Sequence, residues 1–165
     1  MNKKAFIAAA LGAIVQYYDY SLFGLMAATI SKTFFPNDTA VTQLLKAYVI
    51  LSIGVAAKPL GAAVLGRIGD LYGRSRTLTI SLIGTAIPSV VIALTPGYET
   101  IGMLSTLILL IYRMAVCMFV SSGTDGIRLF IFEHIGEKRQ CLGNGLVVMA
   151  TQIGVYLASL SVLFF

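Results

Sequence analysis

Long runs of apolar residues alternate with short polar stretches along the 165 residues of this chain. Charged residues are concentrated in the short stretches, so the runs between them are almost free of charge. A helix crosses the core of a bilayer with about 20 mostly apolar residues, and five runs approach or exceed that length. They predict transmembrane helices over residues 5–30, 44–65, 77–95, 101–132 and 142–165.

The composition supports a membrane protein over a soluble one. Hydrophobic residues make up 58% of the chain and charged residues 12%, and the mean hydropathy is +0.88. A soluble domain carries roughly 25% charged residues, so this chain lacks the polar side chains to cover a water-facing surface. We therefore expect an all-α membrane protein, with residues 1–165 forming one transmembrane bundle in contact with the lipid bilayer.

The basic residues are concentrated in alternate connections between the runs. Lys3 and Lys4 precede the first run, several arginines lie within 67–76, and Lys138 and Arg139 precede the last run. Because cytoplasmic loops collect Lys and Arg, this distribution predicts a cytoplasmic N-terminus in a multi-pass protein of the cytoplasmic (inner) membrane. The net charge of +5 follows from these connections, so we expect no nucleic-acid partner.

Catalytic and cofactor-binding patterns are not found in the sequence. The stretch GRIGDLYGRSRTL, residues 66–78, is rich in glycine but lacks the Gly-Lys-Ser/Thr end of a phosphate loop. Its glycines also lack dinucleotide-binding spacing, and apolar spans flank it where a strand and a helix would be required. One histidine and two separated cysteines, Cys117 and Cys141, do not suggest a metal site. We expect a non-enzyme without metal or cofactor.

The same stretch resembles the signature loop between the second and third helices of the major facilitator superfamily. The matching positions are Gly66, Asp70, Gly73 and Arg74, and Arg76 follows shortly after. The resemblance implies about five helices of an N-terminal six-helix bundle, truncated, with this loop acting as a cytoplasmic gating element. A plain basic turn on the cytoplasmic side is the alternative interpretation.

Further motifs resemble the metabolite:proton symporter family, which contains transporters of proline/betaine, citrate, α-ketoglutarate and shikimate. They are GAIVQYYDYSLFG at 12–24, FFP at 34–36 and KPLGAAVLGRIGD at 58–70. Gln16 stands where the family usually has Glu, and Lys58 where it usually has Arg. Arg113 matches the arginine of the family's fourth helix. The resemblance covers essentially the whole chain but only the N-terminal five of the family's twelve helices.

Two charged residues within the runs are the main candidates for a proton- and substrate-binding site. Asp19 lies near the middle of the first run, where an ionised group costs several kcal/mol or more unless it is paired. The resemblance implies that Asp19 faces a central cavity, whereas a structural, hydrogen-bonded acid is the alternative. Arg113 lies deep in the fourth run, and either Asp19 or Asp125 could neutralise it.

The remaining candidates are aromatic and paired residues. Tyr17 and Tyr18, with Tyr20, could line a cavity and contact a quaternary ammonium by cation–π attraction, or could serve in packing. Asp125 and Arg128 are three residues apart and therefore fall on one helical face, where they could neutralise each other.

Two functional hypotheses follow from these features. The first is a proton-coupled secondary transporter, or a fragment of one, that moves a small polar metabolite such as proline/betaine or an organic acid by alternating access. The second is a truncated or split transporter half that does not transport and acts as a membrane subunit or remnant. Superfamily sites lie between two six-helix halves, so a separate C-terminal half or a second copy is an expected partner.

Overall fold

The computed structural model describes the backbone of residues 3–134 and 140–164 and, within these, the side chains outside 3–6, 8–9, 74–75 and 130–134. All regular elements in these ranges are helices. They are α1 (Lys3–Leu25), α2 (Ala27–Phe34), α3 (Ala40–Ala56), α4 (Lys58–Tyr72), α5 (Arg74–Leu94), α6 (Tyr98–Ile101), α7 (Met103–His134) and α8 (Gln140–Leu163).

Four helical stretches are long and apolar enough to cross a membrane by their length and composition. They are Ala40–Tyr72, which joins α3 and α4, Arg76–Leu94 in α5, Met103–Leu129 in α7, and Gln140–Leu163 in α8. They overlap the second to fifth predicted spans, and the prediction of an all-α membrane fold is confirmed. The first predicted span is divided at Met26 into α1 and α2.

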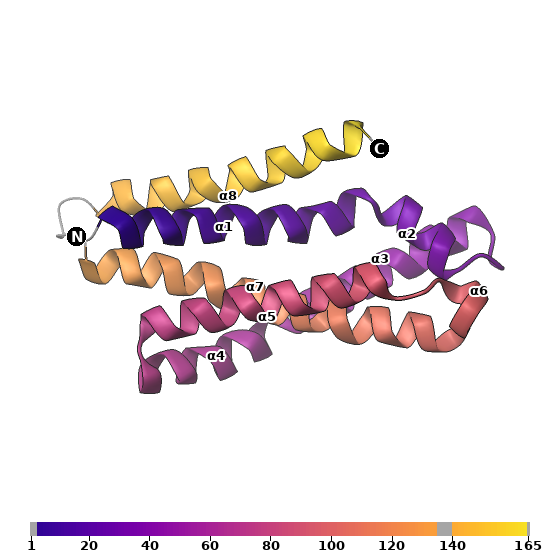
Figure 1. The fold of residues 1–165 in the computed structure, drawn as a ribbon, viewed down its shortest axis with the longest axis horizontal. Helices are drawn as coiled ribbons and strands as arrows, with labels where there is room; N and C mark the ends of the chain where they lie inside the picture. The colour runs from indigo at the N-terminus through magenta and orange to yellow at the C-terminus, as the bar shows by residue number, and fades with distance from the viewer. Residues whose placement is uncertain (1–2, 135–139, 165) are drawn as a thin grey trace.

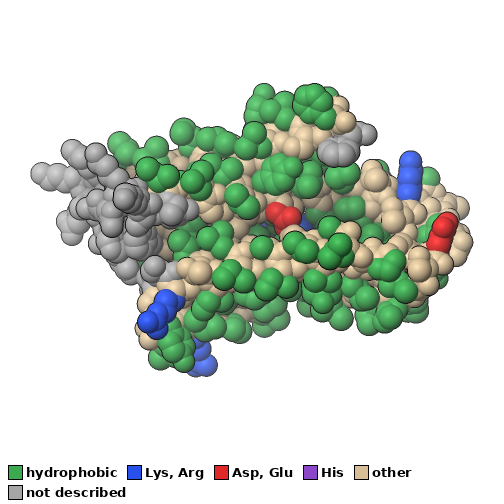
Figure 2. Space-filling view, viewed as in Figure 1, with side chains coloured by type: hydrophobic (Ala, Val, Ile, Leu, Met, Phe, Trp, Pro, Cys, Tyr) green, Lys and Arg blue, Asp and Glu red, His purple; other side chains and the backbone are tan. Residues whose placement is uncertain are grey.

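The helices form an elongated bundle that runs along its long axis (Figure 1). α8 lies along α1, and α7 packs against α4 and α5. The start of α1 and the turn between α4 and α5 lie at one end, and α2 and α6 lie at the other (Figure 1). Lys and Arg side chains gather toward the ends of the described surface, and the middle is largely apolar (Figure 2).

The connection between α4 and α5 is much shorter than the sequence suggested. We expected a loop through 66–76, but α4 continues to Tyr72 and α5 begins at Arg74. Asp70 therefore lies in the last turn of α4 and does not follow the helix end. Gly73 alone reverses the chain with φ +91°, a backbone conformation that side chains other than glycine rarely adopt.

Close backbone contact fixes α4 against α7. A Cβ atom at Gly61 would collide with the backbone of Met118, so only glycine allows this approach. In lipid, small residues of this kind let helices pack tightly, because exclusion from water does not drive their association. This contact sets the position of α4, including its first residue, relative to α7.

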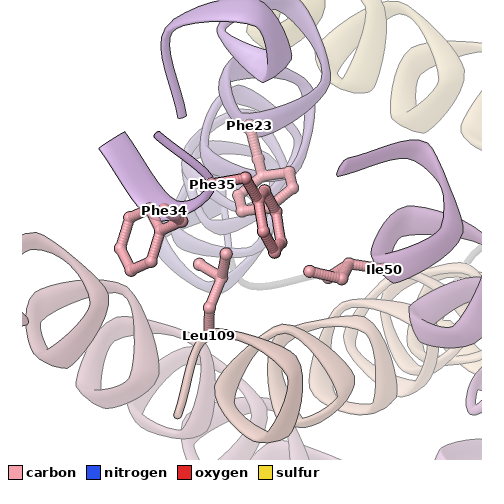
Figure 3. Close-up of a cluster of buried hydrophobic side chains, with 5 residues drawn as sticks. All are labelled: Phe23, Phe34, Phe35, Ile50 and Leu109. Carbon is pink, nitrogen blue, oxygen red and sulfur yellow. The ribbon is translucent and has the colours of Figure 1, made fainter. Parts of the chain in front are cut away.

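An apolar cluster joins α1, α2, α3 and α7 toward the end that carries α2 and α6 (Figure 3). Its members are all buried: Phe23, Phe34, Phe35, Ile50 and Leu109. The aromatic ring of Phe23 connects this cluster with the charged residues in the middle of the bundle. The cluster therefore holds one side of the candidate site in place.

Candidate functional site between α1, α4, α5 and α7

Asp19 lies in a pocket of about 300 Å³ formed by α1, α2, α5 and α7. The hydroxyl of Ser89, from α5, donates a hydrogen bond of 2.7 Å to Asp19 Oδ2. Figure 2 shows an acidic side chain in a hollow in the middle of an apolar face. The pocket also includes Arg113, so the two opposite charges share one space. Asp19 is thus both hydrogen-bonded and reachable from the pocket.

Arg113 is the most deeply placed charge among the described residues, with 1% of its surface exposed. Its Nη2 donates a 3.1 Å hydrogen bond to the backbone carbonyl of Tyr20. Its guanidinium carbon lies 4.2 Å from the ring centroid of Phe23 and 5.0 Å from that of Tyr20, within the range of cation–π attraction. Its Nε has no hydrogen-bond partner among the described residues. A carbonyl and two rings therefore hold this cation without a direct ion pair among the described residues.

Lys58, the first residue of α4, brings a second cation to Tyr20. Its Nζ donates a 3.3 Å hydrogen bond to the Tyr20 hydroxyl and lies 4.4 Å from the ring centroid. From the sequence, Lys58 was noted only as a lysine in place of the usual arginine of a family motif, and neither Ser89 nor Phe23 was named as a site residue. Lys58 could have been found, because an ionisable residue inside an apolar run is itself a sign of a functional site. Ser89 carries no such sign.

The two acids considered as partners of Arg113 lie at different distances from it, although neither forms a direct ion pair with it among the described residues. Asp19 shares its pocket, whereas Asp125 lies twelve positions further along α7, which corresponds to about 18 Å at 1.5 Å per residue. Asp125 instead forms an ion pair of 3.7 Å with Arg128, as their spacing predicted. Both side chains of this pair are well exposed, at 66% and 40%. They lie away from Asp19, Tyr20, Lys58 and Arg113, which together form the charged centre of the bundle.

The three tyrosines of α1 do not form one aromatic surface. The ring centroids of Tyr17 and Tyr20 are 6.2 Å apart, and the planes are tilted by 57°. The hydroxyl of Tyr18 donates a 3.1 Å hydrogen bond to Ser161 of α8, on the seam between α1 and α8. Of these three tyrosines, Tyr20 is the one that contacts cations among the described residues, namely Lys58 and Arg113.

The residues of the expected gating element lie toward the end of the bundle with the α4–α5 turn. Gly66 lines a small pocket of about 90 Å³ with Thr77, Ser122 and Asp125, between α4, α5 and α7. Arg76 is exposed near the start of α5. The side chain of Arg74, the side chains of Lys3 and Lys4, and both Lys138 and Arg139 lie outside the described residues, so the expected cluster of basic groups remains a prediction.

Comparison with known proteins places the chain among membrane transporters. The profile of the family described as sugar (and other) transporter matches residues 4–165. The chain is 30% identical over 166 residues to the proline/betaine transporter of Escherichia coli (strain K12), an alignment covering 92% of the chain and 33% of that protein.

Two further relatives are named for other or broader sets of solutes. The glycine betaine/proline/ectoine/pipecolic acid transporter OusA of Dickeya dadantii (strain 3937) is 32% identical over 138 residues, which cover 84% of the chain and 28% of that protein. The inner membrane metabolite transport protein YhjE of Escherichia coli (strain K12) is 29% identical over 159 residues, 96% of the chain and 36% of that protein. The chain thus spans about a third of the length of these curated relatives. No solved structure shows significant similarity to it.

Proposed function

The chain belongs to the sugar (and other) transporter family of the major facilitator superfamily, and on this premise we propose that it forms part of a proton-coupled secondary transporter. The proposed cargo is a small polar metabolite, such as proline/betaine or an organic acid, carried by alternating access in the cytoplasmic membrane. The relatives named for proline and betaine transport support a small polar cargo. The proposal places the N-terminus on the cytoplasmic side.

The observation that carries this proposal is the common pocket of Asp19 and Arg113 in the middle of the bundle. Ionisable groups within membrane-spanning helices cost free energy, and where they occur they commonly mark ion and substrate pathways. In this pocket Asp19 can take up and release a proton while Arg113 remains charged. Proton uptake therefore changes the net charge beside Arg113, which couples the proton to a charged or zwitterionic solute.

Ser89 can accommodate the carboxyl group of Asp19 in both its ionised and its protonated state. Its hydroxyl lies 2.7 Å from Asp19 Oδ2 and 2.9 Å from the backbone carbonyl of Thr85. A hydroxyl donates one hydrogen, so Ser89 donates to the carboxylate when Asp19 is ionised and to Thr85 when Asp19 is protonated. Neither state leaves the Ser89 donor without an acceptor.

The test is proton-driven uptake by membrane vesicles that contain the Asp19→Asn variant. We expect coupled uptake of the radiolabelled solute that the wild-type chain carries, whether proline, glycine betaine or an organic anion, to be abolished while the amount of inserted protein is unchanged. Asp38→Asn is the matched control, because Asp38 pairs with Lys46 at the end of the bundle, away from the pocket. The measurement is made on the chain alone and with a co-expressed C-terminal half of a relative. Unchanged uptake by Asp19→Asn in either setting would remove Asp19 from the mechanism.

A further inference from the structure

The charged centre holds an excess of positive charge. Lys58 and Arg113 both contact Tyr20, and the acid that shares the pocket with Arg113 is Asp19. Two cations and one ionised acid leave a net charge of one positive unit, and protonation of Asp19 leaves two. An unbalanced charge within a membrane-spanning bundle is unfavourable, so this centre attracts an anion.

The unused hydrogen-bonding groups in this centre are donors. The ammonium of Lys58 has three N–H donors, and among the described residues only the Tyr20 hydroxyl accepts one of them. The Tyr20 hydroxyl keeps its own hydrogen to donate. Arg113 is 1% exposed, and its Nε–H has no acceptor in the part of the chain that the structure describes. A carboxylate, which only accepts hydrogen bonds and has two oxygens, complements this set of donors.

Lys58, Tyr20 and Arg113 differ in how accessible they are to a solute. Lys58 and Tyr20 are half-buried, so an incoming group can reach the ammonium and the hydroxyl. Arg113 is buried and fixed by the Tyr20 carbonyl and by two rings, so it contributes a fixed positive charge. The cations of the protein already lie against the Tyr20 ring, so this ring is not an open site for the quaternary ammonium of a solute.

We propose that Lys58, Tyr20 and Arg113 form a binding site for the carboxylate of a net-anionic metabolite. Lys58 and the Tyr20 hydroxyl contact the carboxylate, and Arg113 supplies the second positive charge. The inference rests on the proposed transport function and narrows its cargo to organic anions over net-neutral zwitterions such as betaine. Protonation of Asp19 strengthens the site, because it removes the negative charge that competes with the cargo for the cations.

The experiment measures equilibrium binding to the purified chain in nanodiscs of phosphatidylcholine. The probe is radiolabelled lactate, and unlabelled succinate, glycine betaine and choline serve as competitors. We expect lactate to bind, succinate to displace it, and glycine betaine and choline to compete at least about tenfold more weakly, because neither is a net anion. Equal or stronger competition by glycine betaine or choline, or no binding of lactate, would overturn the inference.

Variants then locate the site. Lys58→Gln should weaken lactate binding by about tenfold or more, through loss of a charge-assisted hydrogen bond, whereas Lys58→Arg should retain most of it. Tyr20→Phe keeps the ring for Lys58 and Arg113 but removes the hydroxyl, and it should cause a smaller loss. Lys46→Gln is the matched control, because Lys46 also lies over an aromatic ring, that of Phe35, but outside the centre.

Folding of each variant is checked by its elution profile and melting temperature. If Lys58→Gln does not fold, the Lys58→Arg and Tyr20→Phe variants test the proposed contacts. Lactate binding at the wild-type level in Tyr20→Phe, together with loss of lactate binding in Lys58→Arg, would contradict them. Displacement of lactate by phosphatidylglycerol in the nanodisc would assign the site to a lipid headgroup and overturn the cargo assignment.

The experiments distinguish failure of the carboxylate site from failure of the proposed proton-coupled transport. Uptake that depends on Asp19 but is unaffected by Lys58→Gln would reject the carboxylate site and leave proton-coupled transport standing. Lactate binding that depends on Lys58, with uptake indifferent to Asp19→Asn, would reject proton coupling and leave the carboxylate site standing.

Discussion

Two regions of the molecule combine a lysine, an aromatic ring and an acid, and they do so in opposite ways. At the end of the bundle, Lys46 forms a direct ion pair with Asp38 and lies 5.4 Å from the Phe35 ring centroid. In the centre, Lys58 and Arg113 contact Tyr20, while the acid, Asp19, is hydrogen-bonded to Ser89. The outer group neutralises itself, whereas the centre keeps its opposite charges apart.

This difference indicates what each group can do. The side chains of Lys46 and Asp38 are 48% and 28% exposed, and such pairs contribute about 0–1 kcal/mol to stability. A self-neutralised pair also has little remaining affinity for another ion. In the centre, charges without direct partners remain available for a proton and for a solute, at a cost in stability that a bundle in lipid must offset by packing.

The largest effect is expected at Arg113, the buried cation of the charged centre. In Arg113→Met the centre loses its buried charge but keeps a side chain of similar length. We expect uptake of the cargo to fall by about 100-fold or more, since charge-assisted contacts of buried groups are worth several kcal/mol. Uptake is measured in vesicles and normalised to inserted protein. Uptake near the wild-type level in Arg113→Met would mean that the centre is structural.

An intermediate effect is expected at Ser89. In Ser89→Ala the carboxylate of Asp19 loses the hydrogen bond that it accepts from the Ser89 hydroxyl, and a bond to a charged acceptor is worth about 1.5–3 kcal/mol. We therefore expect proton-coupled uptake to fall by about tenfold, with a changed dependence on external pH. Ser159→Ala, which removes a hydroxyl bonded only to the Val155 carbonyl of its own helix, is the control. The prediction fails if the two serine variants behave alike.

The smallest effect is expected at the outer pair, Lys46 and Asp38, which neutralise each other. Lys46→Gln and Asp38→Asn should each change uptake by no more than about twofold. A double-mutant cycle of thermal stability should give a coupling free energy within about 0–1 kcal/mol, as for exposed ion pairs elsewhere. A loss of uptake in Lys46→Gln as large as in Lys58→Gln would show that the two regions are not functionally distinct.

Much of the fold was readable from the sequence, because apolar runs of sufficient length can satisfy their backbone only as helices in lipid. The long α7 and the apolar α5 and α8 matched the expected runs closely. The α4–α5 connection was misjudged, since the arginines and glycines of 66–76 suggested a loop. Charged residues at a membrane surface are equally compatible with a helix end, and a single glycine with positive φ suffices for the turn.

The candidate site was predicted in part. Asp19 and Arg113 were identified because a charge within an apolar run is conspicuous in a sequence. Ser89 was not, because serine is common in transmembrane helices and usually bonds to its own helix. Lys58 was not identified as a site residue, because its motif was used only as a sign of family membership and not for the charge of its side chain.

The sequence by itself determined that the chain forms membrane helices, which family it belongs to, and which helices carry charge. Only the tertiary structure decided which of those charges meet. Asp19 and Ser89 are 70 residues apart, and Arg113 and Tyr20 are 93 residues apart. The helical repeat fixes which residues share a face of one helix, but it does not fix the rotation of that helix or its depth against a neighbour. Those are set by packing between helices, such as the approach of Gly61 to Met118, and they placed Lys58 and Arg113 on one tyrosine.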